Sequence, residues 1–188
     1  MLKKSILILF LGITIFSQGC GNNKKDKQNT KEHIAVSSNK FVLTSTDNKQ
    51  YVVKKEGNGF TVEGQKGKVI IFDIFATWCP PCQASASHLT SLQKKYKDNL
   101  IVIAITVEEN INNEKLEKFK KDYGANYIMV NSDKNRPLIN EISNALELGK
   151  RFPIPIMALY LDAKPINHYI GKVQEEFVES DIKRALHL

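Results

Sequence analysis

Cysteine is scarce in this chain, because its 188 residues contain only Cys20, Cys79 and Cys82. No further pair of cysteine or histidine ligands occurs at short spacing, which argues against a structural zinc site of the common kind. A structural disulfide between Cys79 and Cys82 remains an alternative reading of that pair. The sequence therefore offers one close pair of thiols and a single distant cysteine that needs a separate explanation.

Arginine is scarce as well, with only Arg136, Arg151 and Arg184, and no arginine cluster alternates with aromatic residues. The formal net charge of +7 is concentrated near the N-terminus, where Lys3, Lys4 and five lysines in 21–40 outnumber two acidic residues. A polar, basic segment of this kind is typical of a flexible spacer close to anionic lipid. The charge therefore does not indicate a nucleic-acid surface.

The apolar segment near the N-terminus, Ile6–Phe16, is too short to cross a membrane comfortably. It follows basic residues and precedes Gly19-Cys20, which predicts an export signal. A signal ending in Gly-Cys resembles a bacterial lipoprotein signal, in which Cys20 becomes the lipid-modified first residue, although Ser17 stands where that class usually has an aliphatic residue. An uncleaved N-terminal anchor is the alternative, and either would hold the protein outside the cytoplasm.

These features predict three regions. Residues 1–19 form a lipoprotein-type signal peptide, 20–40 a lipid-anchored flexible tail, and 41–188 one domain long enough to bury a core. Lipid on Cys20 would also account for the odd number of cysteines, since only Cys79 and Cys82 would then carry free thiols.

Two continuous apolar runs, Val69–Phe75 and Leu100–Val107, predict buried strands. The segment between them predicts a helix over about 81–96, so that the three elements form a β-α-β unit. Elsewhere the pattern predicts a hairpin over 41–53, helices over 114–123, 138–148 and 175–186, and strands over 127–130, 156–161 and 166–170. Gly149 is expected to close the third helix, and Phe177, Ile182 and Leu186 are expected to be available to the core from the last one.

The segment Trp78-Cys79-Pro80-Pro81-Cys82 lies at the first strand-to-helix junction. Cys79 is expected at the helix cap and Cys82 one turn later, which allows a small disulfide. Unpaired N–H groups and the helix dipole would stabilise a thiolate at Cys79. Because a thiolate is the group that attacks another disulfide, we expect Cys79 to attack and Cys82 to resolve.

This segment, with Asp73 six residues before Cys79, resembles the active site of thioredoxin-fold proteins, and its two prolines resemble the membrane-anchored TlpA/ResA-like thiol–disulfide oxidoreductases. The resemblance extends from about Phe41 to the C-terminus. It implies an α/β, thioredoxin-like fold: a central mixed sheet flanked by helices, with a short N-terminal β extension. It also implies a reductase of protein disulfides in the bacterial cell envelope that needs no cofactor or metal and is kept reduced by a membrane thiol donor such as a DsbD/CcdA-like protein. Cytochrome c maturation is one pathway such proteins serve.

Asp73 is a carboxylate inside an apolar strand, and its burial would raise its pKa into the range useful for acid–base catalysis. The matching acid in thioredoxins manages the proton of the buried cysteine, whereas many TlpA/ResA-like proteins have asparagine there. Many of them also have Glu and Pro at the positions of Ser85 and Ser87. We therefore expect Asp73 alone to perform the proton transfer; a satisfied structural carboxylate or a solvent-facing edge position is the alternative.

Pro155 precedes the strand over 156–161 by one residue. In the fold that the motif resembles, a cis peptide bond at this place leaves the backbone of the preceding residue, here Ile154, available to a partner strand. Pro153 is the rival, and an ordinary proline at a strand start is the simpler interpretation. Trp78 is expected to cover the cysteines and contact partners, or to pack partly in the core. Glu108 and Glu109 are expected to be solvated loop charges.

Three other functions fit parts of the sequence. A strongly depressed pKa of Cys79 would favour an oxidant that donates disulfides. A copper-binding chaperone would use Cys79, Cys82 and His168, although copper-delivery relatives of the fold usually space their cysteines by three residues. A thioredoxin-fold peroxidase usually has threonine at the position of Ala76. Here the threonine is Thr77, one residue later, which argues against a peroxidase.

Overall fold

A computed structural model describes residues 39–188. The predicted signal peptide, Cys20 and all but the last two residues of the predicted tail lie outside the described residues, so these predictions remain untested. Within 39–188, no helix is long and apolar enough to cross a membrane.

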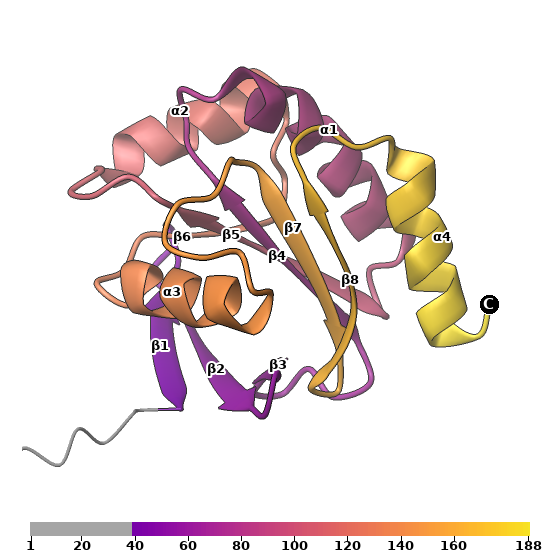
Figure 1. Cartoon of the computed structure of the whole chain (residues 1–188). Helices are drawn as coiled ribbons and strands as arrows, with labels where there is room; N and C mark the ends of the chain where they lie inside the picture. Colours follow the sequence, from indigo (N-terminus) through magenta and orange to yellow (C-terminus); the bar gives the residue numbers. More distant parts are fainter. Residues whose placement is uncertain (1–38) are drawn as a thin grey trace, which may run out of the picture. The chain divides into compact units, whose positions relative to one another are not determined.

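The centre of the fold is a five-stranded mixed sheet with the strand order β6-β5-β4-β7-β8 (Figure 1). Its strands are β4 (Val69–Phe75), β5 (Leu100–Thr106), β6 (Ile128–Val130), β7 (Ile156–Leu161) and β8 (Lys164–Ile170). Strands β4, β5 and β6 are parallel, whereas β7 runs antiparallel to β4 and β8 antiparallel to β7. The two apolar runs form β4 and β5, two of the three inner strands of this sheet. The predicted thioredoxin-like fold is confirmed.

The two faces of the sheet carry separate cores, because side chains alternate along each strand. Ile71 and Phe75 of β4 pack against α1 (Pro80–Lys95), α2 (Asn113–Tyr123) and α4 (Glu175–Leu186). Phe72 and Ile74 face the opposite core, which includes side chains of α3 (Asn135–Ala145). In Figure 1, α3 lies at the lower left of the view, whereas α1 and α4 lie on the right.

The N-terminal extension is a separate antiparallel sheet of β1 (Lys40–Thr44), β2 (Gln50–Glu56) and β3 (Gly59–Val62). It covers the same face as α3, where the ring of Phe60 packs edge-on against Phe72 and Tyr160. Gly59 lies against the turn between β7 and β8, since a Cβ atom there would come within 1.6 Å of the carbonyl oxygen of Ala163. The extension is therefore built into the domain.

The predicted helix over 138–148 is displaced in the structure, where α3 covers Asn135–Ala145. Glu147 has φ +57° and takes the left-handed position that usually belongs to glycine. Its N–H donates to the carbonyl of Asn144 (3.1 Å), and the Leu148 N–H donates to that of Ser143 (2.9 Å). These two bonds end the helix before Gly149, so the expectation that Gly149 closes it is wrong.

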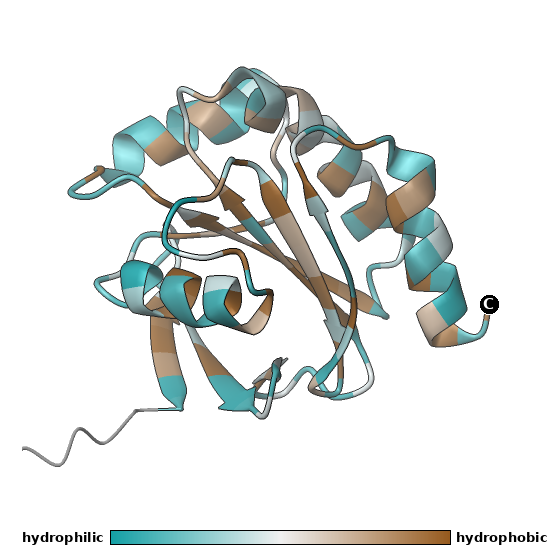
Figure 2. Cartoon of the chain, in the orientation of Figure 1, coloured by the Kyte–Doolittle hydropathy of each residue, from teal (hydrophilic) through white to brown (hydrophobic). Residues whose placement is uncertain are grey.

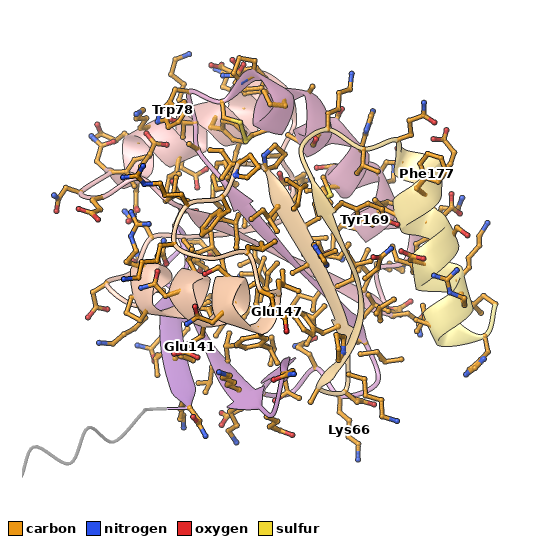
Figure 3. The ribbon with its side chains drawn as sticks, viewed as in Figure 1. Lys66, Trp78, Glu141, Glu147, Tyr169 and Phe177 are labelled. Atoms are coloured by element: carbon orange, nitrogen blue, oxygen red, sulfur yellow. A yellow bond between two sulfur atoms is a disulfide. The ribbon has the colours of Figure 1, made fainter. Side chains whose placement is uncertain are left out.

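The last helix contributes Ile182 and Leu186 to the core as predicted, but Phe177 lies on its other side. Phe177 is 58% exposed and points to solvent (Figure 3), whereas Val178, Asp181 and Ile182 are buried. Asp181 is tolerated there because Asn167 and Tyr169 donate hydrogen bonds to its Oδ2 (2.7 and 2.5 Å) and Arg184 pairs with its Oδ1. Because a charged residue, Asp181, lies on the buried side of α4, the apolar periodicity of the sequence does not identify that side. The prediction that Phe177 faces the core is wrong.

Candidate functional site

The two cysteines form a disulfide at the first turn of α1, with Cα atoms 5.3 Å apart. Cys79 is the N-cap residue, Pro80 and Pro81 occupy the next two positions, and Cys82 comes third. Because the prolines have no N–H, Cys82 supplies the first N–H of the helix, and it points to the Cys79 sulfur at 3.3 Å. No acidic residue lies in this first turn. The end of the helix therefore favours negative charge on the Cys79 sulfur.

Access to the disulfide is narrow. Both cysteines are only 3% exposed, whereas the neighbouring Trp78 is 63% exposed. Figure 3 shows Trp78 on the outside of the molecule at the end of the sheet. The Ile154 carbonyl oxygen is 3.8 Å from the Cys79 sulfur, and the peptide bond between Ile154 and Pro155 is cis. The Cys79 sulfur is therefore bordered by the exposed Trp78 and by the backbone of Ile154.

Asp73 is buried in the middle of β4, on the face that carries the cysteines. Its neighbours in the adjacent strands, Ala104 and Met157, belong to the same core as Cys79 and Cys82. Its Oδ1 atom has no hydrogen-bond partner among residues 39–188. Burial raises the pKa of Asp73 from 3.8 to about 7, since a desolvated carboxyl group favours its neutral form. The group can therefore gain or lose a proton near neutral pH.

Tyr127 is the titratable side chain whose electrostatics are linked to Asp73. Burial raises the pKa of Tyr127 well above its usual value, and the charge of Asp73 raises it further. The hydroxyl therefore stays protonated at neutral pH, while Asp73 is the group that changes its protonation state.

Glu108 is a site residue, although the sequence predicts a solvated loop charge at this position. Its side chain is 11% exposed, against 72% for Glu109, so only Glu109 is a solvated loop charge. The Thr77 N–H donates to Glu108 at 2.6 Å, the Thr77 hydroxyl donates at 3.1 Å, and the Lys115 ammonium donates at 2.6 Å. Because Thr77 directly precedes Trp78, the Glu108 carboxylate fixes the segment that leads into the cysteines.

The structure thus brings Trp78, Cys79 and Ile154 together, with Cys82 and Asp73 behind them on the same side of the sheet. His168 lies on β8 opposite Ala158. No group of three or more His, Cys, Asp or Glu side chains within 39–188 is arranged to hold a metal ion, so His168 does not complete a copper site with the two cysteines.

Comparison with known proteins connects this geometry to a family. Residues 44–185 match the redoxin family, and they include the whole site described above. The thiol-disulfide oxidoreductase ResA of Bacillus thuringiensis (strain Al Hakam) is 26% identical over 190 residues, which cover 98% of this chain and 95% of ResA. The thioredoxin-like protein YneN of Bacillus subtilis (strain 168) is 34% identical over 59 residues, which cover 31% of this chain and 35% of YneN.

Solved structures show the same fold at lower identity. A putative thioredoxin from Neisseria meningitidis aligns with a TM-score of 0.59 and 18% identity, over 80% of this chain and 90% of that one. A secreted disulfide oxidoreductase of Mycobacterium tuberculosis aligns with a TM-score of 0.55 and 14% identity, over 77% and 95%. The chain belongs to the redoxin family, and the resemblance to TlpA/ResA-like thioredoxin-fold oxidoreductases that its cysteine motif indicated is confirmed.

Proposed function

We propose that this thiol–disulfide oxidoreductase reduces protein disulfides outside the cytoplasm through Cys79 and Cys82. The observation that carries the proposal is the position of the Cys79 sulfur, which accepts the first N–H of α1 and lies 3.8 Å from the Ile154 carbonyl oxygen. The sulfur is thus stabilised as a thiolate and placed beside backbone that can hold a partner.

In the proposed reaction, the Cys79 thiolate of the reduced protein attacks one sulfur of a partner disulfide. A mixed disulfide forms, and the second partner sulfur leaves as a thiolate. Cys82 then loses its proton to Asp73 and attacks the Cys79 sulfur, which releases the first partner sulfur. Two electrons pass to the partner, and the disulfide between Cys79 and Cys82 forms. A membrane dithiol donor, such as a DsbD/CcdA-like protein, returns two electrons and completes the cycle.

The backbone next to Pro155 is the proposed contact for the partner chain. The Ile154 N–H has no hydrogen bond within residues 39–188, and the Ile154 carbonyl oxygen lies 3.8 Å from the Cys79 sulfur. An extended partner segment can pair with these groups while its cysteine lies over Cys79 and Trp78 covers the contact. Cytochrome c maturation is one pathway in which such a reductase would act, and the similarity to ResA supports a thiol–disulfide oxidoreductase activity.

The direction of electron flow is tested by the reduction potential of the cysteine pair. Protein beginning at Gly21 is equilibrated with dithiothreitol or glutathione buffers, and its thiols are counted. We expect a potential near that of thioredoxin, about −270 mV, as for a protein fed by a reducing donor. A potential near about −120 mV would instead assign the protein as a disulfide donor. A pair that shows no reversible two-electron couple would contradict both assignments.

Cys20 is the proposed point of attachment to the membrane. The support is the sequence alone, since Cys20 follows an apolar signal and precedes the basic segment 21–40. We expect the N-terminal peptide of the mature protein to begin at Cys20 and to carry the mass of a lipid. Mass spectrometry of protein isolated from membranes measures this directly, and an unmodified N-terminal methionine would indicate an uncleaved anchor.

A further inference from the structure

A groove of about 650 Å³ opens beside the disulfide on the side of α3. One side of it is formed by α3, through Arg136, Asn140 and Asn144, and another by the connection from α3 to β7, through Lys150 and Arg151. Its apolar lining includes Trp78, Phe152 and Ile154. The groove therefore combines apolar surface with exposed polar groups.

The charge of this groove has one sign. Arg136, Lys150 and Arg151 line it, and no acidic side chain does. Arg136 donates to the Val107 carbonyl and pairs with Glu109 at 3.3 Å. Lys150 and Arg151 are exposed and have no ion pair or hydrogen bond to residues within 39–188. Figure 2 shows that the connection from α3 to β7 contains a strongly hydrophilic stretch. Two adjacent cations are thus available to an approaching ligand.

The groove continues directly into the cysteine site. Trp78 and Ile154 are lining residues of the groove, and they are also the residues that border Cys79. A polypeptide whose cysteine meets the Cys79 sulfur would therefore extend its neighbouring residues along the groove. An acidic side chain of that polypeptide would reach Lys150 or Arg151, while an apolar side chain would contact Phe152.

We propose that the groove lined by Lys150 and Arg151 selects partner segments that carry Asp or Glu close to the reactive disulfide. This inference rests on the proposed function and specifies its substrate class. The attraction between such a segment and the groove raises the rate of encounter and places the partner sulfur at Cys79. Segments with Lys or Arg in the same positions are disfavoured by repulsion.

The test uses three oxidised peptides with one internal disulfide, identical except that the flanking residues are Glu, Ser or Lys. Reduced protein covering 21–188 is mixed with each peptide at low salt, and the second-order rate of peptide reduction is measured. Arg151→Glu is the test variant. Lys66→Glu is the matched control, because this substitution changes the net charge by the same amount as Arg151→Glu. Lys66 is exposed and lies at the end of the molecule opposite Trp78 (Figure 3).

We expect the Glu-flanked peptide to react fastest and the Lys-flanked peptide slowest with the natural protein. Arg151→Glu should lower the ratio of these two rates by about tenfold, and Lys66→Glu should leave it unchanged. In 1 M salt, where the Debye length is about 3 Å, the ratio should approach one in every variant. The rate with the Ser-flanked peptide corrects for any change in the reactivity of Cys79 itself.

Two results would overturn the inference while leaving the proposed function intact. One is equal rates with all three peptides, and the other is an equal loss of selectivity in Lys66→Glu and Arg151→Glu. Failure to reduce any peptide, including the Ser-flanked one, would overturn the proposed function and the inference with it.

Discussion

Cys82→Ser is expected to convert the protein into a trap that holds its partner as a stable mixed disulfide. The Cys79 thiolate can still attack, but the second sulfur that releases the partner is missing. Cys79→Ser is expected to lower disulfide exchange to the uncatalysed rate, because the hydroxyl group is not a nucleophile under these conditions. Mixing each reduced variant with an oxidised peptide, followed by non-reducing electrophoresis and mass spectrometry, measures both outcomes.

The serine variants are suitable because the site can accommodate them. Serine is a favourable N-cap residue, so Ser at position 79 can accept the Cys82 N–H as the sulfur does. The double variant Cys79→Ser/Cys82→Ser gives the baseline, and the reduced natural protein is the reference for stability, since it also lacks the disulfide. A stable mixed disulfide formed by Cys79→Ser but not by Cys82→Ser would reverse the two roles.

The parts of the fold that local sequence determines could be predicted closely. The run Val69–Phe75 gives the bounds of β4, because a strand buried on both faces is apolar at nearly every position, here all but Asp73. The position of Cys79 at the N-cap follows from Pro80, which is favourable at the first helical position. The cis bond before Pro155 was predicted from the resemblance, and the structure has it.

The parts that depend on distant contacts could not be predicted from local pattern. The Glu108 side chain is only 11% exposed because Thr77 and Lys115, from different segments, both donate to it. Asp181 is buried because β8 provides Asn167 and Tyr169 as hydrogen-bond donors. The basic groove arises where Trp78, α3 and the segment before Pro155 meet, and no single stretch of sequence contains it.

Asp73→Asn is expected to stabilise the protein above neutral pH and to slow its chemistry. The folded pKa of Asp73, about 7, is higher than the 3.8 of the unfolded chain. The stability associated with the neutral carboxyl group is therefore complete below about pH 4 and is lost as the pH rises through 7. A shift of about three units corresponds to about 4 kcal/mol. Asparagine stays neutral, so the free energy of unfolding of the variant should not fall in this way as the pH rises.

Urea unfolding of the oxidised proteins at pH 4 to 8 measures this difference. The free energy of unfolding of the natural protein should fall relative to that of Asp73→Asn over this range. Equal pH dependence in the two proteins would contradict the burial argument. Release of the partner from the mixed disulfide should be slower in the variant by about a hundredfold near pH 7, because Asp73 no longer accepts the Cys82 proton. An unchanged release rate would exclude Asp73 from proton transfer.

Glu108→Gln is the matched control, since it also neutralises one carboxylate near the cysteines. Burial raises the pKa of Glu108, but hydrogen bonds from Lys115 and Thr77 outweigh burial and leave the pKa below its usual value. The contribution of Glu108 to stability therefore depends on pH in the opposite direction to that of Asp73. Glu108 stabilises the fold above its unfolded pKa of 4.5, and this contribution is lost as the pH falls. Glu108→Gln should thus be less stable than the natural protein at pH 8, where Asp73→Asn is more stable. If both variants changed stability in the same direction at pH 8, a general effect of charge removal would explain the result, and the specific role of Asp73 would rest on the release rate alone.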